Sequence, residues 1–80
     1  MEIKVLAFGR AREIVGSGNM VVTVAPQATV SSLMEQLMVQ YPAMKQLTSF
    51  TIAVNGEYAG PGQNIFAHDE VAIIPPVSGG

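Results

Sequence analysis

The final six residues of the 80-residue sequence, PPVSGG, end in the group best suited to covalent chemistry. Pro75 and Pro76 cannot donate hydrogen bonds to a sheet, so they are expected to stop the strand before them. Gly79 and Gly80 carry no side chains, which leaves the α-carboxylate of Gly80 sterically open. We therefore interpret these residues as a narrow, extended C-terminal segment. Its terminal carboxylate is accessible to adenylation and then to attack by a sulfur or nitrogen nucleophile.

The rest of the sequence offers little side-chain chemistry. It has no cysteine and a single histidine, His68, so thiolate catalysis and disulfides are excluded and we expect no bound metal. His68 is interpreted as a solvated turn residue. Asp69 and Glu70 are neighbours just before a predicted strand, where adjacent side chains point to opposite faces, so an acid–base pair is not expected.

Charge and hydropathy exclude several kinds of partner. The net charge of −2 and only four basic residues argue against nucleic-acid binding. No apolar run approaches the roughly 20 residues of a membrane span, and the start, MEIKVLAF, lacks a signal-peptide layout. We expect a soluble, cytoplasmic protein that binds no membrane. Because 49% of the residues are apolar and only 12% are charged, part of the apolar surface is expected to form an interface.

The hydrophobic pattern predicts one helix and four or five strands. Apolar residues at steps of three and four predict the helix from Val30 to about Gln40, with Thr29 as its N-cap and Pro42 marking its end. A hairpin would pair residues 2–8 with 20–25. The remaining expected elements are a single helical turn at 11–15, a short turn at 43–47, strands at 51–55 and 70–74, and a short strand around Tyr58.

These elements predict an α+β fold, the β-grasp or ubiquitin-like roll, with a mixed sheet and one main helix packed on one face. The first and last strands are apolar on both faces and are expected side by side in the centre of the sheet. Residues 1–76 would form the β-grasp domain and 77–80 a flexible tail. The predicted core is Ile3, Val5, Ile52, Val54, Val71 and Ile73, packed against the apolar side of the helix.

The face of the sheet without a helix is expected to bind a partner. The residues assigned to this face, and expected to be exposed to solvent, are Leu6, Phe8, Ala53, Tyr58 and Ile74. An apolar cluster of this size on a free surface usually marks an interaction site. An error of one residue in register would exchange the two faces, because successive strand side chains point in opposite directions.

Four stretches of the sequence support a more specific assignment: IKVLAFGRAREIVG, TVSSLMEQL, AVNGEY and DEVAIIPPVSGG. Together they resemble the small subunits of molybdopterin synthase, the MoaD-like branch of the ubiquitin-like sulfur carriers. Related thiazole-forming sulfur carriers also end in Gly-Gly, but they are usually shorter and lack the Pro-Pro-Val segment. His68 departs from the family pattern, which commonly has a glycine at this position.

The resemblance implies a role in a two-subunit sulfurtransferase. An adenylyltransferase similar to ubiquitin-activating enzymes would use ATP to adenylate Gly80, and a sulfur donor would convert it to a thiocarboxylate. The chain itself would bind no cofactor. Sulfur would then pass to cyclic pyranopterin monophosphate to form the molybdopterin dithiolene, in a hetero-oligomer whose large subunit supplies the catalytic side chains. The segment inserted into that subunit would be Pro75, Pro76, Val77, Ser78 and Gly79, and the interface would include Phe8, Tyr58 and Ile74.

Three alternatives remain open at the level of sequence. The chain could carry sulfur for another pathway, such as thiazole synthesis. It could be a ubiquitin-like modifier joined through Gly80 to lysines of target proteins, which would give conjugates that survive reducing denaturation. It could also be a passive β-grasp interaction module, in which case deleting Gly79 and Gly80 would leave its function intact.

Overall fold

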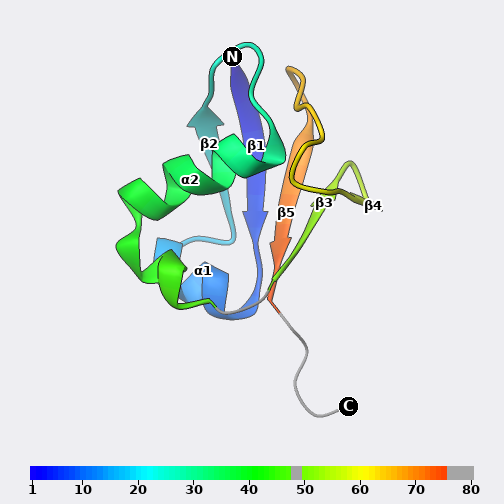
Figure 1. Cartoon of the computed structure of the whole chain (residues 1–80). Helices are drawn as coiled ribbons and strands as arrows, with labels where there is room; N and C mark the ends of the chain where they lie inside the picture. Colours follow the sequence, from blue (N-terminus) through cyan, green and yellow to red (C-terminus); the bar gives the residue numbers. More distant parts are fainter. Residues whose placement is uncertain (48–49, 76–80) are drawn as a thin grey trace.

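A computed structural model of the chain describes residues 1–47 and 50–75 (Figure 1). A five-stranded sheet has the order β2-β1-β5-β3-β4, with β1 and β5 parallel in its centre and the other neighbours antiparallel. The strands are β1 (Glu2–Ala7), β2 (Asn19–Thr23), β3 (Thr51–Val54), β4 (Glu57–Tyr58) and β5 (Glu70–Ile74). The helices are α1 (Gly9–Val15), α2 (Val30–Gln40) and the 3₁₀ helix η1 (Pro42–Gln46). The predicted α+β roll is confirmed, and the predicted boundary at residue 76 lies outside the described residues.

Helix α2 lies across one face of the sheet and leaves the other face without a helix (Figure 1). It begins with a capping box, in which Thr29 Oγ1 accepts from the Ser32 N–H at 3.2 Å and Ser32 Oγ accepts from the Thr29 N–H at 2.8 Å. The carbonyls of Gln63 and Pro61 accept from the first two helical N–H groups at 3.0 and 2.9 Å. The backbone donors at the start of the helix therefore have partners, which fixes the end of α2 against the loop after β4.

Thr29→Ala is expected to lower the free energy of unfolding by about 1 kcal/mol, because the Ser32 N–H loses its acceptor at the helix start. Urea unfolding measures the change. Ser31→Ala is the matched control: Ser31 is exposed in the same turn and its hydroxyl takes no part in the capping box. An equal loss of stability in both variants would contradict the capping role.

The core lies between α2 and the sheet. All six predicted core residues are at most 6% exposed, and Val30, Leu33, Met34 and Leu37 meet them from the helix. The prediction of a single turn at 11–15 is wrong in extent, since α1 begins at Gly9 and buries Ala11 completely at the end of the sheet. Its C-cap, Gly16, has a φ of 81°, and its N–H donates to the Arg12 carbonyl at 2.9 Å. This is the left-handed end that glycine favours.

The segment between β4 and β5 also contributes to the core, although it has no long regular element. Ile65 is fully buried, and its N–H donates to the Ala28 carbonyl at 2.9 Å. Asn64 forms an isolated bridge with Thr29. The segment therefore closes the end of the core beside the start of α2. None of the helices in the described ranges is long and apolar enough to cross a membrane.

Asp69 ties the β3–β4 hairpin to the start of β5. Its carboxylate accepts from Asn55 Nδ2 at 2.9 Å and from the Phe66 N–H at 2.8 Å, while Asn55 Oδ1 accepts from the Glu70 N–H at 3.0 Å. His68 precedes this junction with a φ of 71°, in the left-handed region. His68 therefore has a backbone conformation that favours glycine.

His68→Gly is expected to be more stable than His68→Ala by about 1 kcal/mol, because an alanine Cβ is strained at positive φ. Thermal unfolding of the two variants measures the difference. Val39 on the exposed side of α2 is the control position. Here Val39→Ala is expected to be the more stable variant, because glycine in a helix costs about 1 kcal/mol relative to alanine. A more stable alanine variant at both positions would contradict the strain at residue 68.

Candidate functional site

The side of the sheet opposite α2 carries a continuous apolar surface. Strand register places Leu6, Ala72, Ala53 and Tyr58 in one row across β1, β5, β3 and β4. Beyond this row, Ile74 is paired with Thr51, and Phe8 follows the end of β1. We call this surface the open face and define it by Leu6, Phe8, Ala53, Tyr58, Ala72 and Ile74. None of these residues belongs to the core cluster or packs against it.

The predicted face is confirmed for all five residues, and the predicted exposure to solvent is confirmed for four of them. Phe8 and Tyr58 are 48% and 81% exposed, and Leu6 and Ile74 are half-buried. Ala53 was expected to face solvent, but it is only 6% exposed. Ala53 lies between Ala72 of β5 and Tyr58 of β4, and it forms the floor of the open face.

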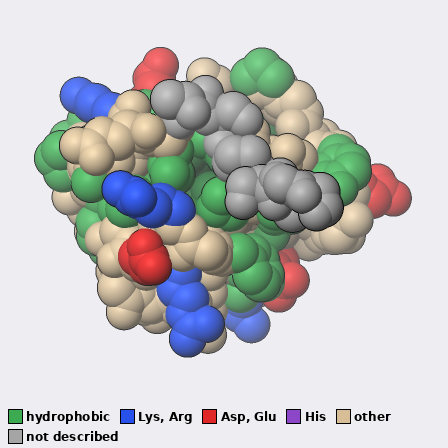
Figure 2. Space-filling model, turned by 90° about the horizontal axis from the view of Figure 1, so that it is seen from below, with side chains coloured by type: hydrophobic (Ala, Val, Ile, Leu, Met, Phe, Trp, Pro, Cys, Tyr) green, Lys and Arg blue, Asp and Glu red, His purple; other side chains and the backbone are tan. Residues whose placement is uncertain are grey.

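Charged residues bound the open face at the start of β5. Lys4 lies beside Glu70 in the parallel β1–β5 pair and opposite Val21 of β2. The apolar part of the face therefore lies toward the other end of β5, where the chain continues to Pro75. At this end of the molecule, hydrophobic side chains lie close to lysine and arginine side chains (Figure 2).

The structure brings three of the predicted site residues together at the end of β5. The Phe8 N–H donates to the Ile73 carbonyl at 3.2 Å, which holds the end of β1 against β5 next to Ile74. Pro75 is half-buried and packs near Gly9, where an added Cβ would lie 3.5 Å from Pro75 Cγ. Tyr58 lies further away on the edge strand β4. The other predicted site residues, Pro76, Val77, Ser78, Gly79 and Gly80, lie outside the described residues.

The described side chains do not form a catalytic cluster of their own. Both oxygens of the Asp69 carboxylate are occupied by structural hydrogen bonds, and His68 is an exposed turn residue. Within residues 1–47 and 50–75, no group of three or more His, Asp or Glu side chains is placed to hold a metal ion. The arrangement can present an apolar docking face beside the start of the C-terminal segment. Ala72 lies on the same face as Ile74, as its alternation with Val71 and Ile73 along the strand predicts.

Comparison with known proteins gives consistent matches over the whole chain. The model of the ThiS family matches residues 5–80. The molybdopterin synthase sulfur carrier subunit of Arabidopsis thaliana is 36% identical over 81 residues, which cover 100% of this chain and 84% of that protein. The protein of the same name from Chlamydomonas reinhardtii is 36% identical over 83 residues, which cover both chains completely.

The fold is also shared with solved structures. The crystal structure of SAMP1, small archaeal modifier protein 1, from Haloferax volcanii superposes with a TM-score of 0.87 at 30% identity and covers 100% of both chains. The chain is therefore similar over its entire length both to sulfur carrier subunits and to a protein named as a modifier.

Proposed function

The chain belongs to the ThiS family, and we propose that it is the sulfur carrier subunit of a molybdopterin synthase, with sulfur carried on Gly80 as a thiocarboxylate. The observation that supports this most is the position of the open face. Its exposed Phe8 and half-buried Ile74 lie beside Pro75, at the end of β5 from which the Gly-Gly segment continues. The full-length similarity to sulfur carrier subunits supports the same function.

Loading of the carrier with sulfur requires two successive reactions of the Gly80 carboxyl group. A Gly80 carboxylate oxygen attacks the α-phosphorus of ATP and pyrophosphate leaves, which gives an acyl-adenylate. A sulfur nucleophile at the oxidation level of sulfide then attacks the carbonyl carbon, and AMP leaves. ATP is bound by the activating adenylyltransferase and not by this chain. The carrier contributes an unhindered carboxylate, since neither Gly79 nor Gly80 has a side chain to block the approach.

Transfer takes place after the carrier docks on the large subunit of the synthase. The open face buries its apolar residues against that subunit, while Pro75, Pro76, Val77, Ser78 and Gly79 extend toward its active site. The thiocarboxylate sulfur attacks cyclic pyranopterin monophosphate, and water then cleaves the bond between this sulfur and the Gly80 carbonyl carbon, which regenerates the Gly80 carboxylate. Each loaded carrier supplies one of the two sulfurs of the molybdopterin dithiolene. Catalytic side chains come from the large subunit, and the complex works in the cytoplasm.

High-resolution mass spectrometry of the C-terminal peptide tests this function. The untagged protein is purified from cells that contain a matching activating enzyme. The peptide is more informative than the intact protein, because oxidation of any of the five methionines adds nearly the same mass as exchange of oxygen for sulfur. Sulfur on Gly80 supports the proposal. An unmodified carboxylate, together with no adenylation by ATP and that enzyme in vitro, would overturn it.

A protein-modifier function is the second candidate, because the similarity to SAMP1 reaches 30% identity over the full chain. A modifier would also need an activated Gly80, but its acyl group would pass to lysine amines. Higher-mass conjugates that survive reducing denaturation, and that disappear when Gly79 and Gly80 are deleted, would favour this function. Free thiocarboxylate without conjugates favours the sulfur carrier.

A further inference from the structure

The turn between β3 and β4 is attached to β5 partly by a side chain. Asn55 and Gly56 have φ values of 52° and 85°, as the two central residues of a type I′ hairpin turn do. The Asn55 N–H donates to the Glu70 carbonyl at 2.8 Å, which continues the β3–β5 ladder by one residue. The return bond from the Glu70 N–H goes to Asn55 Oδ1 at 3.0 Å, where a regular ladder would use the backbone carbonyl. The Asn55 side chain therefore completes the attachment of the turn to β5.

Asp69 fixes the orientation of this asparagine. One oxygen of its carboxylate accepts from Asn55 Nδ2 at 2.9 Å, and the other accepts from the Phe66 N–H at 2.8 Å. The two side chains are complementary, because the amide supplies a donor and the carboxylate supplies only acceptors. The backbone carbonyl of Asp69 also accepts from the Lys4 N–H of β1 at 3.3 Å. Asp69 thus links the hairpin turn to both central strands, β1 and β5.

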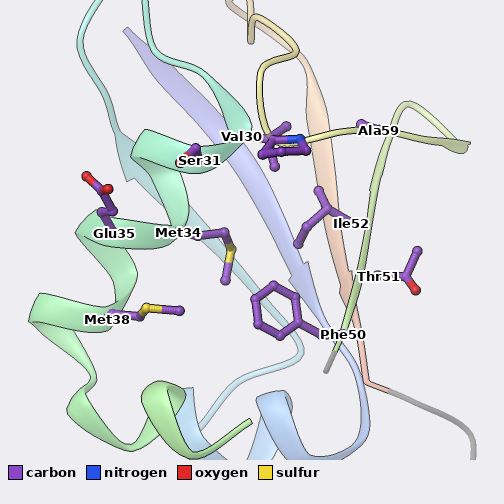
Figure 3. Close-up of a pocket in the computed structure, with 10 residues that line it drawn as sticks. Val30, Ser31, Met34, Glu35, Met38, Phe50, Thr51, Ile52 and Ala59 are labelled. Carbon is purple, nitrogen blue, oxygen red and sulfur yellow. The ribbon is translucent and has the colours of Figure 1, made fainter. Parts of the chain in front are cut away.

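Side-chain packing gives strand β4 little additional support. Glu57 and Tyr58 are exposed, and neither belongs to the core cluster or packs against it. On the helix side, a space of about 420 Å³ lies between α2 and β3, with Met34, Phe50 and Ile52 around it (Figure 3). The orientation of β4 therefore depends on its backbone bonds to β3 and on the turn that precedes it.

We propose that Asn55 and Asp69 are positioning residues for docking of the open face. Their hydrogen bonds hold the β3–β4 hairpin in the orientation that keeps Tyr58 in the apolar row of that face. Tyr58 is 81% exposed and has no contact with the core cluster that could hold it in place. The inference rests on the proposed function, because it names the residues that prepare the same surface for the large subunit. Both residues act through Tyr58 and not by contact with the partner.

Exchanging the two residues tests this pairing. In Asn55→Asp, two carboxylates face each other. In Asp69→Asn, the new amide nitrogen meets either Asn55 Nδ2 or the Phe66 N–H, and both are donors. The double variant, Asn55→Asp with Asp69→Asn, keeps the net charge and restores all three bonds. Its carboxylate at position 55 accepts from the Glu70 N–H and from the amide at position 69, whose oxygen accepts from the Phe66 N–H.

Affinity for the purified large subunit is measured by isothermal titration calorimetry, at a temperature where every variant is folded. Each single variant is expected to bind about fivefold more weakly, the usual effect of one hydrogen bond, and the double variant to bind within about twofold of the unmodified chain. A lower melting temperature with an unchanged Kd in the single variants would overturn the proposal, and so would an undiminished loss of affinity in the double variant. Glu35→Gln, an exposed carboxylate-to-amide change on α2, is the matched control and should change neither quantity.

A Tyr58→Ala background shows whether the pair acts through Tyr58. This substitution alone is expected to weaken binding about tenfold. Because its side chain is then already absent, Asp69→Asn should cause no further loss in the same background. A second full loss would contradict the proposal, since the junction would then affect another part of the interface. Normal binding of Tyr58→Ala would also contradict it, because the pair would have nothing to position.

Hydrogen exchange of the free chain separates this inference from the proposed function. The Ala59 N–H donates to the Ile52 carbonyl at the end of the hairpin, and the Val24 N–H donates to the Met1 carbonyl beside the opposite edge strand. Each single variant is expected to raise exchange at Ala59 about fivefold relative to Val24, and the double variant to reverse the change. Failure of the unmodified chain to bind the large subunit would overturn the proposed function. Unchanged exchange at Ala59 together with normal binding would overturn the positioning role alone.

Discussion

One alanine added after Gly80 is expected to slow sulfur transfer by about a hundredfold or more, with no change in the melting temperature. The reacting carbonyl would move by one residue, and misplacement of a reacting group by about 1 Å is already enough for a loss of this size. Stability should be unaffected because the core cluster is formed by residues between Ile3 and Ile73. Single-turnover transfer to the pterin acceptor, with the large subunit in excess, measures the rate.

The control for the extended chain is Gly60→Ala, a change of similar size in an exposed loop where an added Cβ meets nothing within 4 Å. This variant should transfer sulfur at the normal rate. Comparing adenylation with transfer then shows which step the extension blocks. A normal rate for the extended chain would exclude Gly80 as the sulfur-bearing residue, and a fall in melting temperature would contradict the independence of the core from the last residues.

Phe8→Glu is expected to weaken binding to the large subunit by about 2 kcal/mol or more, which is about thirtyfold in Kd. Phe8 is 48% exposed on the open face, so a glutamate remains hydrated in the free protein and the fold is retained. In the complex the same carboxylate would be buried in an apolar interface without a partner. Isothermal titration calorimetry with the purified large subunit measures the change.

Val39→Glu is the control for the added negative charge, because it places a glutamate outside the open face. Val39 is an exposed apolar residue on α2, on the helix side of the sheet, and its replacement should leave the Kd unchanged within about twofold. If both variants lost affinity equally, the effect would be one of net charge and not of the open face. If Phe8→Glu bound normally, the large subunit would have to dock elsewhere.

The long regular elements were predictable because their patterns repeat over several residues. Helix α2 has the predicted bounds, since Thr29 supplies a cap, Pro42 follows its end and the apolar spacing continues for three turns. The central position of β1 and β5 followed from apolar residues on both of their faces. The same alternation of side chains along each strand is sufficient to assign Phe8, Ile74 and Tyr58 to the open face.

Features that depend on neighbouring segments were not predictable in the same way. The burial of Ala53 is one example, because strand periodicity assigns a side chain to a face of the sheet but does not give its exposed fraction. Ile65 stands in a loop without periodicity, and its burial depends on contact with Ala28 far away in the sequence.

The parallel pairing of β1 with β5 has a consequence for synthesis of the protein on the ribosome. Residues emerge in chain order, so β1 lacks its central neighbour until residues 70–74 have been made. Contacts between such distant segments form late in folding, since a long loop must first be closed. The sheet therefore reaches its final form only when the C-terminal segment is also nearly complete. A chain that ends before residue 70 lacks both Gly80 and the central strand β5, so it stays unfolded and is open to proteolysis before it can occupy a partner unproductively.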